Sequence, residues 1–173
     1  MQRDGWMKAS VGAVALCLAF STAQAQTALS EQDQEFVEMA AEGGHAEVEM
    51  GKQALESEHP DIKAFGQQMI DEHGKMNEEL AALAKQKGIE PPASPDLASQ
   101  AKGVMMEVLP GETFDSQYVS SQLDDHKETL ELFQKQAQRG QAPELKALAE
   151  KGIPTIQKHI SELEALQHKP ELQ

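Results

Sequence analysis

Four long segments of the chain place apolar residues three and four positions apart, which is the spacing of one face of an α-helix. The four stripes consist of Phe36, Val37, Ala40, Ala41, Gly44, Val48, Gly51 and Leu55; Ile62, Phe65, Met69, Ile70, His73, Met76, Leu80, Leu83 and Ala84; Phe114, Tyr118, Gln122, His126, Thr129, Phe133 and Ala137; and Leu145, Leu148, Gly152, Ile156, His159, Ile160, Leu163 and Leu166. Little of the Val and Thr alternation typical of strands is present. The pattern therefore predicts an all-α protein.

Capping residues, glycines and prolines mark the ends of these predicted helices. Ser30, followed three residues later by Asp33, has the pattern of a helix start. Proline disfavours helical geometry in the residue before it, so the first helix ends by His59. The predicted helices run from Ser30 to His59, from Pro60 to Lys87, from Thr113 to Arg139 and from Pro143 through Leu166.

The connections between the helices predict how they pair. The link at residues 59–60 is short, so it joins an antiparallel helical hairpin, and the last two helices form a second hairpin. Residues 89–112 form a long, proline-containing connection, within which residues 97–109 are predicted to form a short helix. Two hairpins joined by one long crossover make a ferritin-like antiparallel four-helix bundle. We predict that residues 26–173 form this bundle as a single domain.

The glycine pair Gly43–Gly44 lies inside the first predicted helix. A glycine in a helix interior costs about 1 kcal/mol relative to alanine. We therefore expect a neighbouring helix to approach closely at this point.

Three histidines, His73, His126 and His159, lie on the apolar stripes, each near the middle of a different helix. Glu47 lies at a similar level of the first helix, because Glu47 and His73 are each about 18–20 Å from the first turn at 1.5 Å per residue. An unpaired buried polar group costs roughly 1–3 kcal/mol, so these side chains need a common partner. We predict that the four residues form one polar cluster in the core.

Three interpretations of this cluster stay open. The first is a metal site, because Glu47, His73, His126 and His159 would suit copper or zinc. The second is a structural or protein-interaction bundle, in which the same residues form a metal-free hydrogen-bonded network that fixes the register of the helices. The third is a metalloenzyme, but the chain has no Ser-His-Asp order, phosphate-binding glycine loop or Gly-x-Ser-x-Gly elbow, so a non-enzymatic role is favoured.

A di-iron centre is disfavoured. Ferritin-like di-iron sites need Glu-x-x-His on two helices. The residue three positions before His73 is Ile70, and the residue three positions before His126 is Leu123. Both bridging carboxylates are therefore missing.

Four neighbours of the histidines have predicted roles of their own. Met69 is expected to fill the core rather than to bind a metal, and Gln122 to donate a hydrogen bond to an imidazole or to Glu47. Glu72 and Asp125 directly precede histidines, so they project elsewhere on their helices and are expected to be solvated. Contact with the imidazole of a neighbouring helix is the alternative for both carboxylates.

The N-terminal residues have the pattern of a secretory signal peptide. Arg3 and Lys8 precede an apolar run over residues 9–20, and an Ala-x-Ala cleavage site ends at Ala25. The run is shorter than the ~20 residues that span a bilayer. We predict that residues 1–25 are removed, that the mature chain has no transmembrane helix, and that it reaches the periplasm.

Charge narrows the range of partners. The net charge is −14, and such a surface repels the phosphate backbone, which argues against nucleic acid as a partner. It favours cations instead. The only cysteine, Cys17, lies in the predicted signal peptide, so no disulfide is expected in the mature chain.

The mature chain also resembles a known family. The matching stretches are residues 36–44, 47–51 and 65–73, with Phe114–Asp115, Asp125–His126 and Ile153–Pro154 leading to His159. They are similar to an exported bacterial family of unknown function, commonly labelled predicted outer membrane protein and placed among ferritin-like folds. The family typically has Asp where this chain has Glu72, which is a conservative change. It usually has Met where this chain has Gln122, so a methionine thioether ligand on the helix that carries His126 is in doubt.

The resemblance implies a helical bundle and export but no established activity. Together with the residues, it leads us to expect an exported envelope protein that binds a transition metal, for sequestration or stress tolerance. The expected partner is the metal ion. Peripheral association with the outer membrane is compatible with this expectation, and the oligomeric state is left open.

Overall fold

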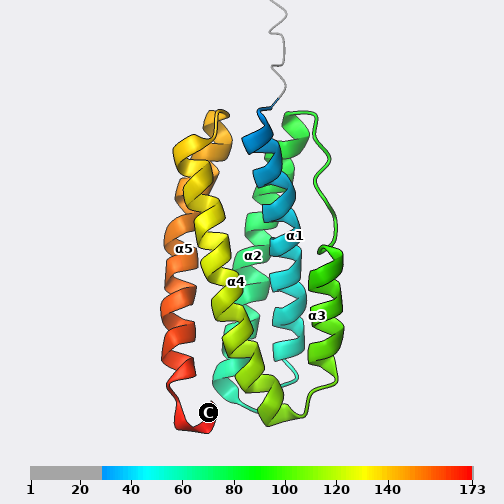
Figure 1. The fold of residues 1–173 in the computed structure, drawn as a ribbon, viewed down its shortest axis with the longest axis vertical. Coiled ribbons are helices and arrows are strands. Elements are labelled where there is room, and N and C mark those ends of the chain that lie inside the picture. The colour runs from blue at the N-terminus through cyan, green and yellow to red at the C-terminus, as the bar shows by residue number, and fades with distance from the viewer. Residues whose placement is uncertain (1–28, 173) are drawn as a thin grey trace, which may run out of the picture.

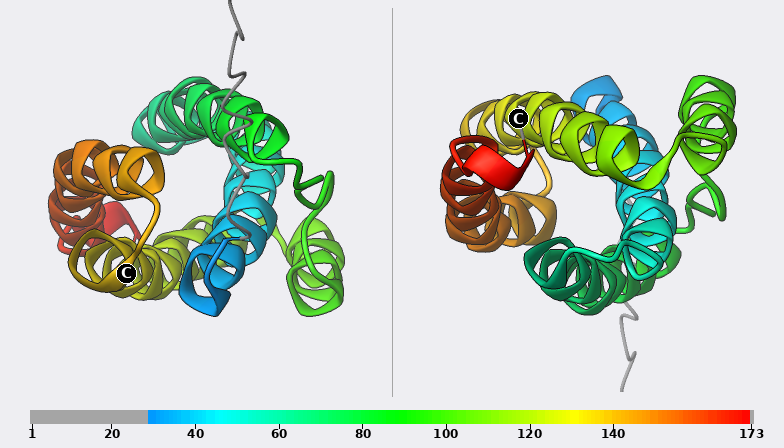
Figure 2. Two further views of the ribbon diagram at one scale, coloured as in Figure 1. Left: turned by 90° about the horizontal axis from the view of Figure 1, so that it is seen from above. Right: turned by 90° about the horizontal axis from the view of Figure 1, so that it is seen from below.

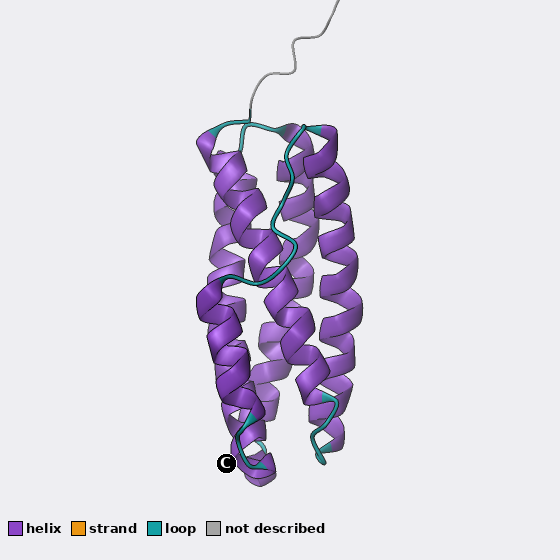
Figure 3. Ribbon diagram, turned by 90° about the vertical axis from the view of Figure 1, so that its right-hand side faces the viewer, coloured by secondary structure: helices purple, strands orange, loops and turns teal. Residues whose placement is uncertain are grey.

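The computed structural model describes residues 29–172, which form five α-helices, one short 3₁₀ helix and no strands (Figures 1 and 3). The elements are α1 (Glu31–Ala54), α2 (Pro60–Gln86), α3 (Leu97–Glu107), α4 (Gly111–Arg139), α5 (Pro143–Gln167) and the 3₁₀ helix η1 (Pro170–Leu172). The all-α prediction is confirmed. The predicted signal peptide, residues 1–25, lies outside the described residues.

Most helix ends lie where the sequence predicts them. The Ser30 side chain accepts a hydrogen bond from the backbone N–H of Asp33 at 3.1 Å and caps α1. Pro60 and Pro143 begin α2 and α5. Gly88 has a φ of 76°, a left-handed conformation that glycine adopts without strain just after α2.

Three boundaries differ from the prediction by more than one residue: α3 ends at Glu107 rather than at residue 109, α4 begins at Gly111 rather than at Thr113, and the largest difference is at the end of α1. Helix α1 ends at Ala54, several residues before the predicted end at His59. The backbone N–H groups of residues 55–57 bond to carbonyl groups three residues earlier, so the chain tightens into a turn. The Ser57 hydroxyl then accepts from the backbone N–H of His59 at 2.9 Å and shapes the start of α2.

The four long helices lie side by side, and α1 with α2 and α4 with α5 form two antiparallel pairs, while α2 and α4 run in the same direction (Figure 1). Helix α1 packs mainly on α2 and α4 mainly on α5, with further contacts between α1 and α4 and between α2 and α5. Seen end-on, the long helices surround a common interior, and α3 lies outside it against α1 and α4 (Figure 2). No helix within residues 29–172 has the length and apolar character needed to cross a bilayer.

The core consists of two apolar clusters separated by a polar layer. One cluster is centred on Phe36, Phe133 and Leu145, and the other on Phe65, Tyr118 and Leu163. On each long helix the residues of the two clusters lie on either side of one polar residue. These residues are Glu47, His73, His126 and His159, and all four are at most 4% exposed.

The close approach expected at Gly43–Gly44 occurs at only one of the two glycines. A Cβ on Gly44 of α1 would lie 1.9 Å from the Asn77 side-chain oxygen of α2, so a larger residue there would force that side chain to move. A Cβ on Gly43 would meet nothing within 4 Å. The space beside Gly43 is therefore open, and packing does not explain this glycine.

Asp33 ties the start of α1 to the turn between α4 and α5. Its carboxylate accepts from the Gln136 side chain at 2.7 Å and from the backbone N–H groups of Gln141 and Ala142 at 3.1 Å. The Ser30 hydroxyl donates to the same carboxylate at 2.6 Å. Burial raises the pKa of Asp33, but these hydrogen bonds outweigh it and hold the pKa below its ordinary value of 3.8.

Candidate metal centre

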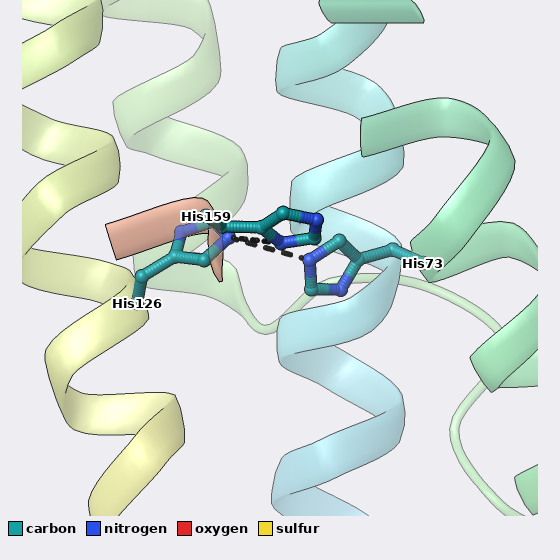
Figure 4. Close-up of side chains that lie close together, drawn as sticks. All are labelled: His73, His126 and His159. Carbon is teal, nitrogen blue, oxygen red and sulfur yellow. Dashed lines mark hydrogen bonds between the residues drawn. The ribbon is translucent and has the colours of Figure 1, made fainter. Parts of the chain in front are cut away.

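The three histidines meet in the polar layer, as the sequence predicts (Figure 4). His126 Nε2 lies 3.4 Å from His73 Nε2 and 3.2 Å from His159 Nδ1. One nitrogen atom of each of the three rings lies within 4.8 Å of a nitrogen atom of the other two. Helices α2, α4 and α5 each contribute one imidazole, so the site exists only when all three pack together.

The backbone fixes the tautomer of His126. Its Nδ1 lies 2.9 Å from the backbone carbonyl oxygen of Gln122, one turn earlier on α4. A carbonyl oxygen can only accept, so Nδ1 carries the proton. The neutral ring therefore has its lone pair on Nε2, which faces the other two histidines.

A carboxylate, that of Glu72, fixes the tautomer of His159. Glu72 Oε2 lies 2.7 Å from His159 Nε2, and Lys158 lies 3.3 Å from the other oxygen of Glu72. Burial raises the pKa of Glu72, but the contacts with His159 and Lys158 outweigh it and lower the pKa. The ionised carboxylate accepts from Nε2–H of His159, which leaves the lone pair of that ring on Nδ1.

The result is that two lone pairs face each other, on His126 Nε2 and His159 Nδ1, with the third ring beside them. Metal–nitrogen bonds of about 2.0–2.1 Å at tetrahedral angles place ligand nitrogens roughly 3.3 Å apart. The separations of 3.2 and 3.4 Å fit that geometry. Outward nitrogens that donate to a carboxylate or carbonyl are the usual arrangement around metal-bound histidines.

Burial keeps the imidazoles in the form that binds metals. Burial first, and then the neighbouring His126 and His159, hold the pKa of His73 well below 6.5. Burial also lowers the pKa of His159, against the opposing effect of Glu72. Because metals bind only the unprotonated imidazole nitrogen, these shifts favour binding near neutral pH.

Glu47 lies beside the cluster rather than among the three facing nitrogens. Its Oε1 is 3.6 Å from His126 Nδ1, the nitrogen on the opposite side of that ring from the other histidines. Its Oε2 has no hydrogen-bond partner among the described residues. Burial raises the pKa of Glu47, although His126 and the Gln122 side chain act in the opposite direction.

The predicted roles of the neighbours have mixed outcomes. Met69 is fully buried in the apolar cluster around Phe65, as expected. The Gln122 side chain hydrogen-bonds to Glu47, one of its two predicted partners, and lowers the pKa of that carboxyl against the effect of burial. Its backbone carbonyl also accepts from His126, which the sequence pattern did not indicate. Asp125 is ion-paired with Lys102 of α3 at 2.6 Å.

Glu72 was expected to be solvated, and the structure shows the stated alternative instead. Its side chain reaches across from α2 to His159 on α5. Helical periodicity describes positions on one helix, so it could not show that a neighbouring helix brings an imidazole within reach. The adjacent Glu72–His73 pair was the only signal in the sequence.

A comparison with protein families identifies the group to which the chain belongs. Residues 18–166 match the domain of unknown function DUF4142. The chain is a member of the DUF4142 family. No curated protein matches it.

Solved structures with a similar fold include two kinds of protein. A DUF305 fragment from Deinococcus radiodurans superposes with a TM-score of 0.71 at 17% identity, covering 80% of this chain and 97% of that one. CopM in its Cu(I)-bound form superposes with a TM-score of 0.64 at 19% identity, covering 77% of this chain and 93% of that one. CopM in its Ag-bound form gives a TM-score of 0.63 at 19% identity, with the same coverage. At these identities the likeness establishes a shared fold.

Proposed function

We propose that this DUF4142 protein binds one transition-metal ion, copper or zinc, through His73 Nε2, His126 Nε2 and His159 Nδ1. Imidazole nitrogens are suitable ligands for both metals. In this proposal Glu72 orients His159, and the Gln122 carbonyl orients His126. Glu47 is not a fourth ligand but a neighbour of His126, which revises the role that the sequence alone gave it.

The proposal depends on a missing proton. In a metal-free cluster of neutral rings, His126 donates its proton to Gln122 and His159 donates its proton to Glu72. His73 can donate to His126 Nε2 at 3.4 Å. No proton is then left between His126 Nε2 and His159 Nδ1, which are 3.2 Å apart, so the lone pair of His159 Nδ1 faces a nitrogen that has no proton to donate. A bound cation removes this conflict.

The two other interpretations are less well supported. A metal-free network must take up an extra proton, which burial opposes because it lowers the pKa values of His73 and His159. A metalloenzyme needs room for a substrate beside the metal. His126 and His159 are fully buried and His73 is 3% exposed, which favours holding an ion over acting on a substrate.

The fold neighbours support copper as the first metal to test. CopM has been solved in Cu(I)-, Cu(II)- and Ag-bound forms. That property belongs to CopM, and the low identity gives no residue correspondence. The support comes from a shared helical scaffold together with a nitrogen-rich centre in this chain.

A metal titration of the purified, untagged protein tests the proposal. We expect one equivalent of Cu²⁺ or Zn²⁺ per chain by elemental analysis after gel filtration. Changing outer partners of a metal ligand typically costs 10–100-fold in affinity, so loss of a ligand in His126→Leu should cost more than roughly 100-fold. The matched control is His168→Leu, because His168 is exposed at the end of α5. Equal binding by both variants, or none by the wild type, would reject the proposal.

We further propose the finer assignments made from the sequence, namely a ferritin-like four-helix bundle that is exported and works in the envelope. Antiparallel packing of the four long helices supports the bundle class. Export depends on residues 1–25 alone. The intact mass of protein recovered from the periplasm tests it, since removal of the signal leaves Gln26 as the first residue.

A further inference from the structure

A pocket of about 200 Å³ opens between α1, α3 and α4, on the side of the polar layer where Glu47 lies. Helix α3 forms its outer wall through Ser99 and Lys102, and Asp96 lies at its N-terminal end. Glu47 and Gln122 line the pocket from α1 and α4. The proposed metal centre does not use this space.

Two buried oxygen atoms that line this pocket lack partners. Glu47 is 4% exposed and Gln122 is 1% exposed, and within residues 29–172 neither Glu47 Oε2 nor Gln122 Oε1 accepts a hydrogen bond. An unsatisfied buried polar atom costs roughly 1–3 kcal/mol. Two such oxygen atoms in one pocket indicate a ligand that takes electron pairs from both, as a cation does.

The charges around the pocket favour a cation over any other ligand. Five carboxylates line it, those of Glu42, Glu47, Asp96, Asp125 and Glu128, against one cation, Lys102. Lys102 is already ion-paired with Asp125. Burial and the neighbouring carboxylates of Asp96 and Glu38 raise the pKa of Glu42, as expected where negative charge is in excess.

A second, smaller cavity lies beside this pocket, on the side of His73. It has a volume of about 20 Å³, enough for about one water molecule, and His73 is part of its lining. The two spaces share Met39, Gly43, Glu47, Thr129 and Leu132. Gly43 lines both cavities, and the space beside its Cβ position is open.

The hollow on the other side of the cluster differs in charge. It lies between α2 and α5, next to Glu72, and is lined by Lys75, Lys151 and Lys158 together with Glu72 and Glu79. Three cations against two carboxylates do not attract a metal ion. The two sides of the histidine cluster are therefore not equivalent for an approaching cation.

We infer that the pocket between α1, α3 and α4 is the loading site, where a metal cation first binds to Glu47 and Gln122 before it passes Gly43 to reach His73. This inference rests on the proposed metal-binding function and gives Glu47 and Gly43 a role in it. The carboxylates at the rim raise the local cation concentration. Clefts of one charge sign speed association by 10–10³-fold at low ionic strength.

Two variants separate loading from binding. Gly43→Leu fills the space beside Gly43 with a side chain, and a leucine in place of glycine favours the helix, so the fold is retained. The matched control is Gly74→Leu, because Gly74 also lies in a helix with open space around its Cβ position and lines neither cavity. Stopped-flow uptake of Cu²⁺ by the full chain should be more than about 10-fold slower in Gly43→Leu, with unchanged copper per chain at equilibrium.

The second variant, Glu42→Gln/Glu128→Gln, removes charge from the rim. Its control is Glu78→Gln/Glu164→Gln, which neutralises two exposed carboxylates of α2 and α5 that line neither cavity. We expect uptake by the rim variant to be roughly 3–10-fold slower at low salt and nearly normal at 1 M salt, where charges are screened beyond about 3 Å.

The outcomes distinguish the two proposals. If the wild type takes up no copper or zinc, both proposals fail. If the wild type binds metal but both variants load as fast as their controls, the metal centre stands and the loading site is overturned. Slow loading of the pocket variants with slow loading of the controls also overturns it, because the effect would then not depend on the pocket.

Discussion

Helix α1 carries two buried carboxylates in different surroundings, Asp33 at its start and Glu47 in its middle. Asp33 accepts hydrogen bonds from two side chains and two backbone N–H groups, and its pKa is lowered. Glu47 has one oxygen atom that no described residue hydrogen-bonds, and its pKa is raised. Both side chains are at most 4% exposed, so burial does not distinguish them.

The difference shows how a structural carboxylate can be told from one kept for a ligand. A buried charge with a full set of donors stabilises the fold, because its hydrogen bonds replace those it made to water. A buried carboxylate with a free oxygen atom destabilises the fold and retains the capacity to bind. The contrast between Asp33 and Glu47 therefore predicts opposite effects of removing each charge.

The largest effect is expected from Asp33→Ala. This change leaves the Gln136 side chain and the backbone N–H groups of Gln141 and Ala142 without their acceptor. At roughly 1–3 kcal/mol per unsatisfied buried group, we expect a loss of at least about 3 kcal/mol in the free energy of unfolding. Urea denaturation of the metal-free protein at pH 7 measures it.

The pH dependence of the free energy of unfolding gives a second test of the role of Asp33. Because the folded-state pKa of Asp33 lies below its ordinary value of 3.8, its contribution is complete above that pH and is lost as the pH falls through the folded-state pKa. Wild type and Asp33→Asn should therefore converge in stability at acid pH. A constant difference down to the lowest pH measured would show that the charge of Asp33 is not what stabilises the turn.

The next largest effect is expected at Glu72, which is not a proposed ligand but hydrogen-bonds to the proposed ligand His159. Glu72→Gln cannot accept from His159 Nε2–H as strongly as the carboxylate does, so the ring loses basicity and orientation. We expect metal affinity to fall by about 10–100-fold, measured by competition with a chelator.

The control for this prediction is Glu79→Gln. Glu79 lines the same hollow and is ion-paired with Lys151 at 2.6 Å, and no hydrogen bond joins it to an imidazole. Its replacement should leave metal affinity unchanged. An equal loss of affinity in both variants would mean that the local charge, rather than the bond to His159, supports the site.

The smallest effect is expected from Glu47→Gln. The amide is neutral and can donate to the free Oε1 of Gln122, so we expect a gain of about 1 kcal/mol in the free energy of unfolding at pH 8. Because burial raises the folded-state pKa of Glu47 above 4.5, ionisation destabilises the fold as pH rises through that pKa. The gain should therefore vanish below pH 4.5.

Urea denaturation at both ends of this pH range, with a chelator present, measures the gain. A loss of stability in Glu47→Gln at pH 8 would contradict the contrast between Asp33 and Glu47. It would place Glu47 with Asp33 as a carboxylate that supports the fold.

Much of the fold follows from local signals in the sequence. The Ser30 cap, the prolines at the starts of α2 and α5 and the glycine after α2 set helix ends that the structure retains. The end of α1 was placed too late, because the Ser57 hydroxyl bonds in a turn that apolar periodicity does not report.

The sequence predicted which histidines meet in the candidate site but not how their rings are oriented. Three histidines on apolar stripes at mid-helix could be brought together by any antiparallel packing of those helices. Their ring orientations could not be predicted, because each depends on a partner such as the Gln122 carbonyl or Glu72. The direction in which Glu47 faces depends on side-chain packing between α1 and α4, which sequence spacing does not encode.

The sequence alone determined that the chain is helical and that its polar residues lie at one level of the apolar stripes, because helix periodicity and capping are local properties. Only the tertiary structure decided which nitrogen of each ring faces its neighbours, and that Asp33 is fully bonded while Glu47 is not. Those outcomes depend on atoms from different helices coming within about 3 Å of each other, a distance at which hydrogen bonds form. The sequence therefore determines which side chains are present at this level, and the packing of the helices determines which atoms they hydrogen-bond to.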